Sequence, residues 1–221
     1  MKKSPVDIFG CLLVSALASA LHAQVPVSST PSKNEAALVI GATETPGVGL
    51  QRDGAVNLNS SLALGVEYDR HIIGRHTALY GGVDFVASPF DVKTSFAAAD
   101  VSPQYAYLFL SPHVRLKFNA NGVLEPWLLF GGGYADFSPA QPRSGGIKVS
   151  GAGSSGTLEF GGGVDTKPLV RIKGIPIVGE LPIGTRFEVR DFYSGQPNYG
   201  VHTNSSLQNN VAFTGGLVLR F

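Results

Sequence analysis

The stretch Asn210-Val-Ala-Phe-Thr-Gly-Gly-Leu-Val-Leu-Arg-Phe221, at the end of the sequence, decides the fold. Large apolar side chains occupy most positions of one parity, whereas Thr214 and Arg220 fall on the other. Because successive side chains of a strand point to opposite faces, this alternation predicts a β-strand with one apolar face and one polar face. The length suits a tilted strand that crosses a membrane, which takes about 9–11 residues.

Seven more segments show the same alternation, separated by stretches rich in Gly, Ser, Asn and Pro. We therefore predict strands at Ala36–Thr43, Ser61–His71, Thr77–Ser88, Tyr105–Phe118, Val123–Phe137, Gly156–Thr166, Ile183–Tyr193 and Asn210–Phe221. The first strand is the least fixed, because Gly49–Leu58 could extend it or replace part of it. The pattern predicts an all-β fold, a closed antiparallel transmembrane β-barrel of about eight strands that occupies residues 35–221.

The connections between the predicted strands alternate in length, as in barrels with long external loops and short periplasmic turns. The long ones are Glu44–Ser60, Pro89–Gln104 and Ser138–Ser155, and the short ones are Ile72–His76 and the tight turn Asn119–Gly122. The sixth connection, Lys167–Pro182, should be short but is long and contains three prolines. It is either a pair of strands prolonged beyond the membrane or a periplasmic contact element, and the sequence leaves both open.

Nearly all charged residues of the strands fall on a single face. In the seventh strand, for example, Phe187 lies on the face opposite Arg186 and Glu188. A Lys or Arg on the lipid side at mid-membrane costs about 2–4 kcal/mol, so the charges are expected in the lumen. A soluble lipocalin-like barrel would have the opposite polarity. We predict a nearly neutral network of lumen ion pairs formed by Glu67, Asp69, Asp84, Arg115, Lys117, Glu159, Asp165, Arg186, Glu188, Arg190 and Arg220.

Aromatic residues and glycines are placed unevenly along the predicted strands. Aromatic side chains near strand ends predict girdles at the two membrane interfaces, and Trp127 is expected in the barrel wall or a girdle. The predicted girdle residues are Tyr68, Phe90, Tyr105, Tyr107, Phe137, Phe192 and Tyr193. Glycine pairs and triplets inside the strands predict a narrow, strongly curved wall. No helix is predicted after them, so they do not indicate a phosphate-binding loop.

The first residues have the pattern of an export signal. Two lysines precede a short apolar run, Cys11–Leu21, which is far shorter than the roughly 20 residues of a membrane-spanning helix. Small residues permit cleavage after Ala20 or after Ala23. We expect residues 1–23 to be a signal peptide and residues 24–34 to be a mobile leader.

The composition argues against several classes of function. Only 15% of the residues are charged, compared with about 25% in typical soluble domains. Cys11 is the only cysteine and lies in the signal, so a mature chain would have no disulfide and no cysteine-based zinc site. The formal net charge of +1 argues against nucleic-acid binding. The sequence thus predicts no cofactor and no metal site.

The export signal, the strands of about ten residues and the ending quoted above resemble the outer-membrane β-barrel domain of OmpA/OmpX-like and opacity-type surface proteins. This resemblance implies export to the bacterial outer membrane and contact with its lipid. It also implies that the barrel assembly machinery recognises the last strand. The residues that match that assembly signal are Phe213, Leu217, Leu219 and Phe221.

Some small barrels of this type modify lipid A, so an enzymatic role must be weighed. Ser111 and His113 have the spacing of a deacylase pair, but their order is reversed and Pro112 lies between them. Their parity points to the lumen, where carboxylates would satisfy the imidazole. No histidine shows metal-ligand spacing with other ligands. The leading hypothesis is a non-enzymatic surface barrel whose external loops contact a ligand, ahead of a narrow solute pore and then a lipid A-modifying enzyme.

Overall fold

The computed structural model describes residues 31–51, 54–96, 104–120, 122–139, 143–144, 147–148, 153–175, 179–199 and 202–221. The predicted signal peptide, both of its cleavage positions and most of the predicted leader lie outside the described residues. Within the described ranges, no helix is both long and apolar enough to span a membrane.

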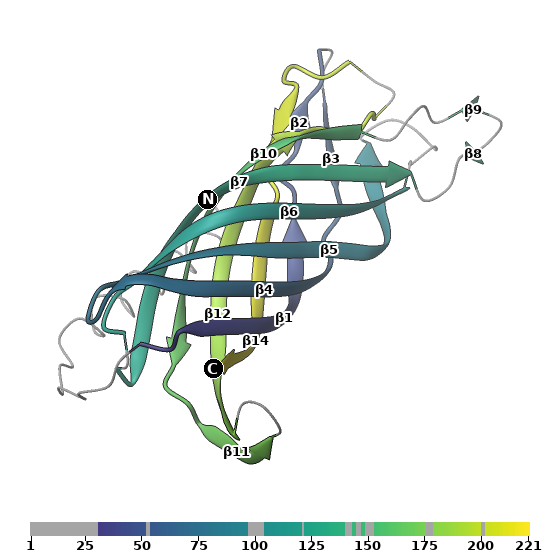
Figure 1. The fold of residues 1–221 in the computed structure, drawn as a ribbon. Coiled ribbons are helices and arrows are strands. Elements are labelled where there is room, and N and C mark those ends of the chain that lie inside the picture. Colours follow the sequence, from purple (N-terminus) through teal and green to yellow (C-terminus); the bar gives the residue numbers. More distant parts are fainter. Residues whose placement is uncertain are drawn as a thin grey trace, which may run out of the picture.

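Eight long antiparallel strands form the wall of a closed barrel (Figure 1). They are β1 (Asn34–Glu44), β4 (Ser61–Gly74), β5 (Ala78–Phe96), β6 (Gln104–Lys117), β7 (Leu124–Pro139), β10 (Gly153–Thr166), β12 (Gly179–Gly195) and β14 (Val211–Arg220). Each pairs with the next in the chain, and the last closes the barrel by pairing with β1, for example at Leu38↔Leu217. Closure removes the unpaired edges of the sheet. The predicted fold class is confirmed, and each predicted strand overlaps one wall strand.

The first long connection forms a hairpin of its own. Its strands are β2 (Val48–Gly49) and β3 (Ala55–Leu58), and β3 pairs with the far end of β5 at Val56↔Phe96. The described residues of segment 49–58 therefore add to the external end of the barrel and do not replace the first wall strand. Three further short strands are β8 (Arg143–Ser144) and β9 (Ile147–Lys148), which pair with each other, and β13 (Leu207–Gln208), which pairs with β12.

The sixth connection prolongs the wall at the end where the C-terminus and the short turns lie (Figure 1). Its strand β11 (Val170–Ile175) pairs with the first residues of β12, beginning at Val170↔Ile183. The ladder shifts in register between Lys173 and Ile175, and Gly174 between them has a φ of +78°. The sequence left open whether this connection is a pair of prolonged strands or a periplasmic contact element, and the structure shows prolonged strands.

The turn between β6 and β7 is as tight as the sequence predicts. Asn119 has a φ of +50°, and the backbone N–H of Gly122 donates to the Asn119 carbonyl over 2.8 Å. Asparagine tolerates this left-handed conformation better than most residues. A Cβ at position 122 would lie 2.1 Å from the side-chain nitrogen of Asn119 and 2.9 Å from its carbonyl oxygen, so any larger residue there would force the turn to shift.

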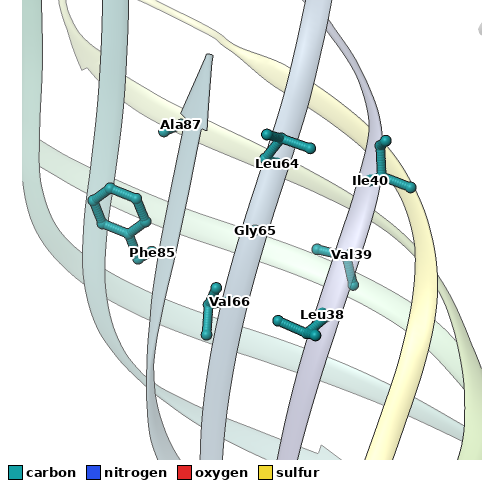
Figure 2. A pocket seen from close by; sticks show the side chains of 8 residues that line it. All are labelled: Leu38, Val39, Ile40, Leu64, Gly65, Val66, Phe85 and Ala87. Carbon is teal, nitrogen blue, oxygen red and sulfur yellow. The ribbon is translucent and has the colours of Figure 1, made fainter. Parts of the chain in front are cut away.

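The outward-facing side chains of the wall are large and apolar. Figure 2 shows one part of this surface, an apolar depression over β1, β4 and β5 lined by Leu38, Ile40, Leu64, Val66, Phe85 and Ala87. Similar exposed apolar residues occur on each of the five remaining wall strands, among them Val114, Phe130, Phe160, Phe187 and Leu217. Soluble monomers rarely expose contiguous apolar surface on this scale. The wall therefore has the polarity of a protein surrounded by lipid.

Candidate functional site

The inward-facing side chains fill the lumen in two layers that follow each other along the strands. An ionic layer occupies the half nearer the short turns, and an aromatic layer occupies the half nearer the long connections. In β6, for example, Lys117 and Arg115 belong to the ionic layer, while Phe109 and Tyr107 belong to the aromatic layer. The structure places all eleven residues of the predicted ion-pair network in the ionic layer, and each is almost completely buried.

At the turn end of the ionic layer, a single ammonium group gathers three carboxylates. The Nζ atom of Lys117 lies 2.7 Å from Glu35 Oε2, 2.8 Å from Asp165 Oδ2 and 3.3 Å from Glu125 Oε2. Arg220 donates to Glu125 Oε2 over 2.7 Å. These contacts join β1, β6, β7, β10 and β14 across the lumen.

Two guanidinium groups occupy the middle of the ionic layer. Arg186 donates from Nε and Nη2 to the two oxygens of Asp165, at 2.8 Å each, and from Nη1 to Glu67 Oε2 at 2.5 Å. Arg115 donates to the same Glu67 oxygen over 2.8 Å and also to Asp69. Charge-assisted bonds of this kind are the strong class of hydrogen bond, and here they also connect strands that are not neighbours in the wall, such as β12 with β4.

The sequence predicts Trp127 in the barrel wall or a girdle, but its side chain lies inside the lumen and is fully buried. The Arg115 guanidinium carbon stands 4.3 Å above its ring, that of Arg186 is 5.4 Å away, and the indole Nε1–H donates to Asp165 over 3.1 Å. The correction follows from parity, because Trp127 alternates in phase with the inward Glu125 on the same strand. Its flat ring covers the guanidinium groups and its N–H satisfies a buried carboxylate.

Arg190 forms the part of the ionic layer that adjoins the aromatic layer. It contacts Asp84 at 2.5 Å, Glu188 at 2.8 Å and Glu159 at 3.1 Å, and it also pairs with Glu67. One cation thus serves four carboxylates. Where acids share so few bases, the buried negative charge is only partly compensated.

The lumen is less neutral than the sequence analysis expected. Two buried acids were missed, Glu35 and Glu125, which brings the total to eight acids against five Lys and Arg residues and one histidine. Each missed acid lies within a residue or two of a strand end, where the alternation is weakest as a signal. Glu35 falls outside the predicted first strand, and Glu125 precedes Pro126. The excess of acids is a property that only the assembled barrel reveals.

The aromatic layer closes the external half of the lumen. Its ring residues are Tyr105, Tyr107, Phe109, Phe137, Phe192 and Tyr199, packed with Val48, Val56 and Leu58 from the first loop. The rings of Phe109 and Phe192 stack with their centroids 4.4 Å apart and their planes 8° from parallel. Burial raises the pKa of the loop residue Tyr199, whose hydroxyl donates to Gln208 over 2.7 Å.

The prediction of aromatic girdles is wrong for most of the residues that it named. Four of the predicted girdle residues, Tyr105, Tyr107, Phe137 and Phe192, face the lumen and are buried. Only the outward-facing Tyr68 and Tyr193, 40% and 39% exposed, lie on the outer surface as expected. The side chain of Phe90 lies outside the described part of the chain. On its own strand, each of the four has the same parity as the inward-facing charges. The alternation, and not the position along the strand, therefore determines which side of the wall these side chains face.

Ser111 and His113 face the lumen and are almost completely buried, at 0% and 6% exposure. His113 contacts two carboxylates, with Nε2 2.8 Å from Asp69 and Nδ1 3.4 Å from Asp84. The imidazole is thus held by lumen carboxylates, and neither side chain is presented to the lipid-facing surface.

No family model matches the sequence, and no curated protein is significantly similar to it. Among solved structures, Neisserial surface protein A is 14% identical, with a TM-score of 0.52 over 87% of this chain and all of that one. Two others have lower TM-scores: Ail of Yersinia pestis, in complex with a heparin analogue (13% identical, TM-score 0.44, 84% of this chain and 99% of that one covered), and the outer membrane enzyme PagL (15% identical, TM-score 0.41, 85% and 99% covered). The first likeness confirms the predicted outer-membrane β-barrel fold. Identity at this level shows the fold alone.

Proposed function

We propose that this protein is a surface barrel of the bacterial outer membrane that neither conducts solutes nor catalyses a reaction. The barrel, with its lumen filled by side chains, would present its external loops to ligands or to neighbouring membrane components. The observation that carries the proposal is the double filling of the lumen by the ionic layer and the aromatic layer.

The distribution of polarity supports a membrane location. Apolar side chains face outward on all eight strands, and the charged side chains of the ionic layer face inward, whereas outward charges such as Arg70 and Asp136 lie near strand ends. Water outside such a barrel would be unfavourable, whereas lipid would match the apolar exterior. A closed barrel also satisfies its backbone hydrogen bonds without water, as a membrane requires. The predicted export signal fits the same location.

The absence of a pore is supported by the burial of the lumen side chains. Arg115, Arg186 and Trp127 are fully buried across the ionic layer, and Phe109 and Phe192 are fully buried across the aromatic layer. An eight-stranded barrel has an interior just wide enough for its own side chains to fill. A solute would have to displace both layers.

A contact role is supported by the way two external loops hold each other. Leu50 forms an isolated β-bridge with Thr203, and the Asn204 side-chain amide donates to the Leu50 carbonyl over 2.8 Å. The backbone N–H of Asn204 also donates to Gly49. The first and last external loops are therefore joined into one surface above the aromatic layer. A preorganised surface loses less conformational entropy when a partner binds.

The test is the ion conductance of the refolded mature barrel in a planar bilayer, with heat-shifted gel mobility to verify folding. We expect no single-channel steps from the folded wild-type protein. The double variant Phe109→Ala/Phe192→Ala removes the stacked pair, and Leu158→Ala on the outer surface is its control. Steady steps from the wild type would overturn the proposal and favour the narrow pore.

A further inference from the structure

Three potential metal ligands from different strands meet between the two layers of the lumen. They are Asp84 of β5, His113 of β6 and Glu159 of β10, and one ligand atom of each lies within 4.8 Å of the others. Gly131 of β7 pairs with both His113 and Glu159. A Cβ at Gly131 would lie 2.8 Å from His113 Cβ and 3.1 Å from Glu159 Oε2, so glycine leaves these two side chains room to approach.

The polar atoms of this cluster are incompletely satisfied. Arg190 contacts Asp84 Oδ2 and Glu159 Oε1. With both carboxylates ionised and the imidazole proton on Nε2, Asp84 Oδ1, Glu159 Oε2 and His113 Nδ1 are buried and accept no hydrogen bond from the described residues. Buried polar atoms are normally paired, because leaving them unpaired costs free energy. In that state the three atoms need a shared positive charge, either a cation or protons.

A second cluster in the same lumen shows what such a group of acids requires. Glu35, Glu125 and Asp165 also bring their ligand atoms within 4.8 Å of one another. There the Lys117 ammonium contacts all three, at 2.7–3.3 Å. At the Asp84 cluster the only fixed cation in the described contacts is Arg190, which is shared with Glu67 and Glu188. The same need for positive charge is met in one cluster and left partly unmet in the other.

His113 is oriented as a metal-binding histidine would be. Its Nε2 lies 2.8 Å from Asp69 Oδ1, so a proton on Nε2 donates to that carboxylate and leaves the lone pair on Nδ1. Nδ1 is the nitrogen nearer the cluster, 3.4 Å from Asp84 Oδ2. Metal-binding histidines usually donate their other N–H to a carboxylate or carbonyl in this way. Ser111, buried opposite Asp84 in the β5–β6 register, adds a hydroxyl without a described hydrogen bond.

We propose that Asp84, His113 and Glu159 bind one divalent transition-metal ion of the Zn²⁺ class inside the barrel. One imidazole nitrogen and two carboxylate oxygens are a ligand set that Zn²⁺ accepts, and the Ser111 hydroxyl or a water would complete a tetrahedron. The aromatic layer on one side and the ionic layer on the other enclose the site. The ion would therefore enter before the barrel closes, exchange slowly and act as a structural cation.

The experiment refolds the mature barrel into detergent with Zn²⁺ or with EDTA, removes free metal by gel filtration, and counts retained zinc by native mass spectrometry. We expect about one ion per wild-type barrel and none after EDTA. Glu159→Gln should lose the ion. Glu188→Gln is the matched control, because it makes the same change beside Arg190 without removing one of the three ligands.

Two results would overturn the proposal. One is a folded wild-type barrel that retains no zinc, which would leave shared protons as the balancing charge. The other is equal zinc retention by Glu159→Gln and the wild type. If Glu159→Gln fails the heat-shift test for folding, a second experiment refolds the wild type with Co²⁺ and records its visible absorption spectrum. A tetrahedral visible absorption band that His113→Gln abolishes supports the site, and its absence from the wild type overturns it.

Discussion

At the scale of single residues, an ion pair inside the lumen should contribute far more to the free energy of unfolding than an exposed one. Arg186 contacts Glu67 and Asp165 with no exposed surface, whereas Arg171 contacts Glu180 at 3.1 Å with both side chains largely exposed. Arg186→Met should lower the free energy of unfolding by about 3–5 kcal/mol, because it leaves buried carboxylates uncompensated. Arg171→Met should change it by less than about 1 kcal/mol. Urea unfolding in lipid vesicles, followed by the fluorescence of the single tryptophan, measures both, and equal losses would contradict this account.

The inward or outward direction of a side chain could be predicted residue by residue from parity. All eleven charged residues of the predicted network face inward because lipid excludes them. The same rule applied to Tyr105 and Tyr107 gives the lumen, since both share the parity of Arg115 on β6. The girdle prediction failed there because it used position along the strand instead of parity. What parity could not predict is which charges meet, since that depends on the register between strands distant in sequence.

At the scale of the element, the last strand has two separable roles. Phe221 is half-exposed on the outer surface, and only its backbone exchanges hydrogen bonds with Asn34, at 2.8 and 3.0 Å. Phe221→Ala should therefore leave the stability of the refolded barrel almost unchanged. If the outward residues of β14 form an assembly signal, the variant should still slow insertion by purified assembly machinery. The readout is the heat-shifted fraction over time, with Leu158→Ala on β10 as the control, and equal rates would refute the signal.

The strand β5 is longer than the sequence pattern predicts. The sequence predicts that this strand stops at Ser88, because Pro89 lacks the N–H that a ladder needs. In the structure the ladder with β6 shifts between Ser88 and Val92 and ends at Lys93, while the strand β5 itself runs to Phe96. An irregularity is where a sheet tolerates proline. The continuation pairs with β3, a partner in the first loop that no local pattern indicates.

At the scale of the whole molecule, the lumen is built from contacts that the sequence specifies only in part. Period-2 alternation predicted a closed barrel with charges inside, but not the separation of an ionic layer from an aromatic layer. That separation needs the register of all eight strands, and it needs Val56 and Leu58 of the first loop to fold over the barrel end. The external loops therefore differ in kind. The first loop completes the core, and the fifth connection contributes no described residue to it.

This difference predicts how the barrel tolerates changes to its loops. The ladder between β7 and β10 is complete from Gly153↔Phe137 to Thr166↔Leu124, so replacing residues 140–152 by a short glycine turn should leave a folded barrel of nearly unchanged stability. Leu58→Asp, a single substitution in the first loop, should destabilise it more, because a carboxylate would be buried beside aromatic rings without a partner. Urea midpoints of the two variants, each verified by heat-shifted mobility, decide the matter. A shortened fifth connection that prevents assembly, or a harmless Leu58→Asp, would show that the loops do not divide in this way.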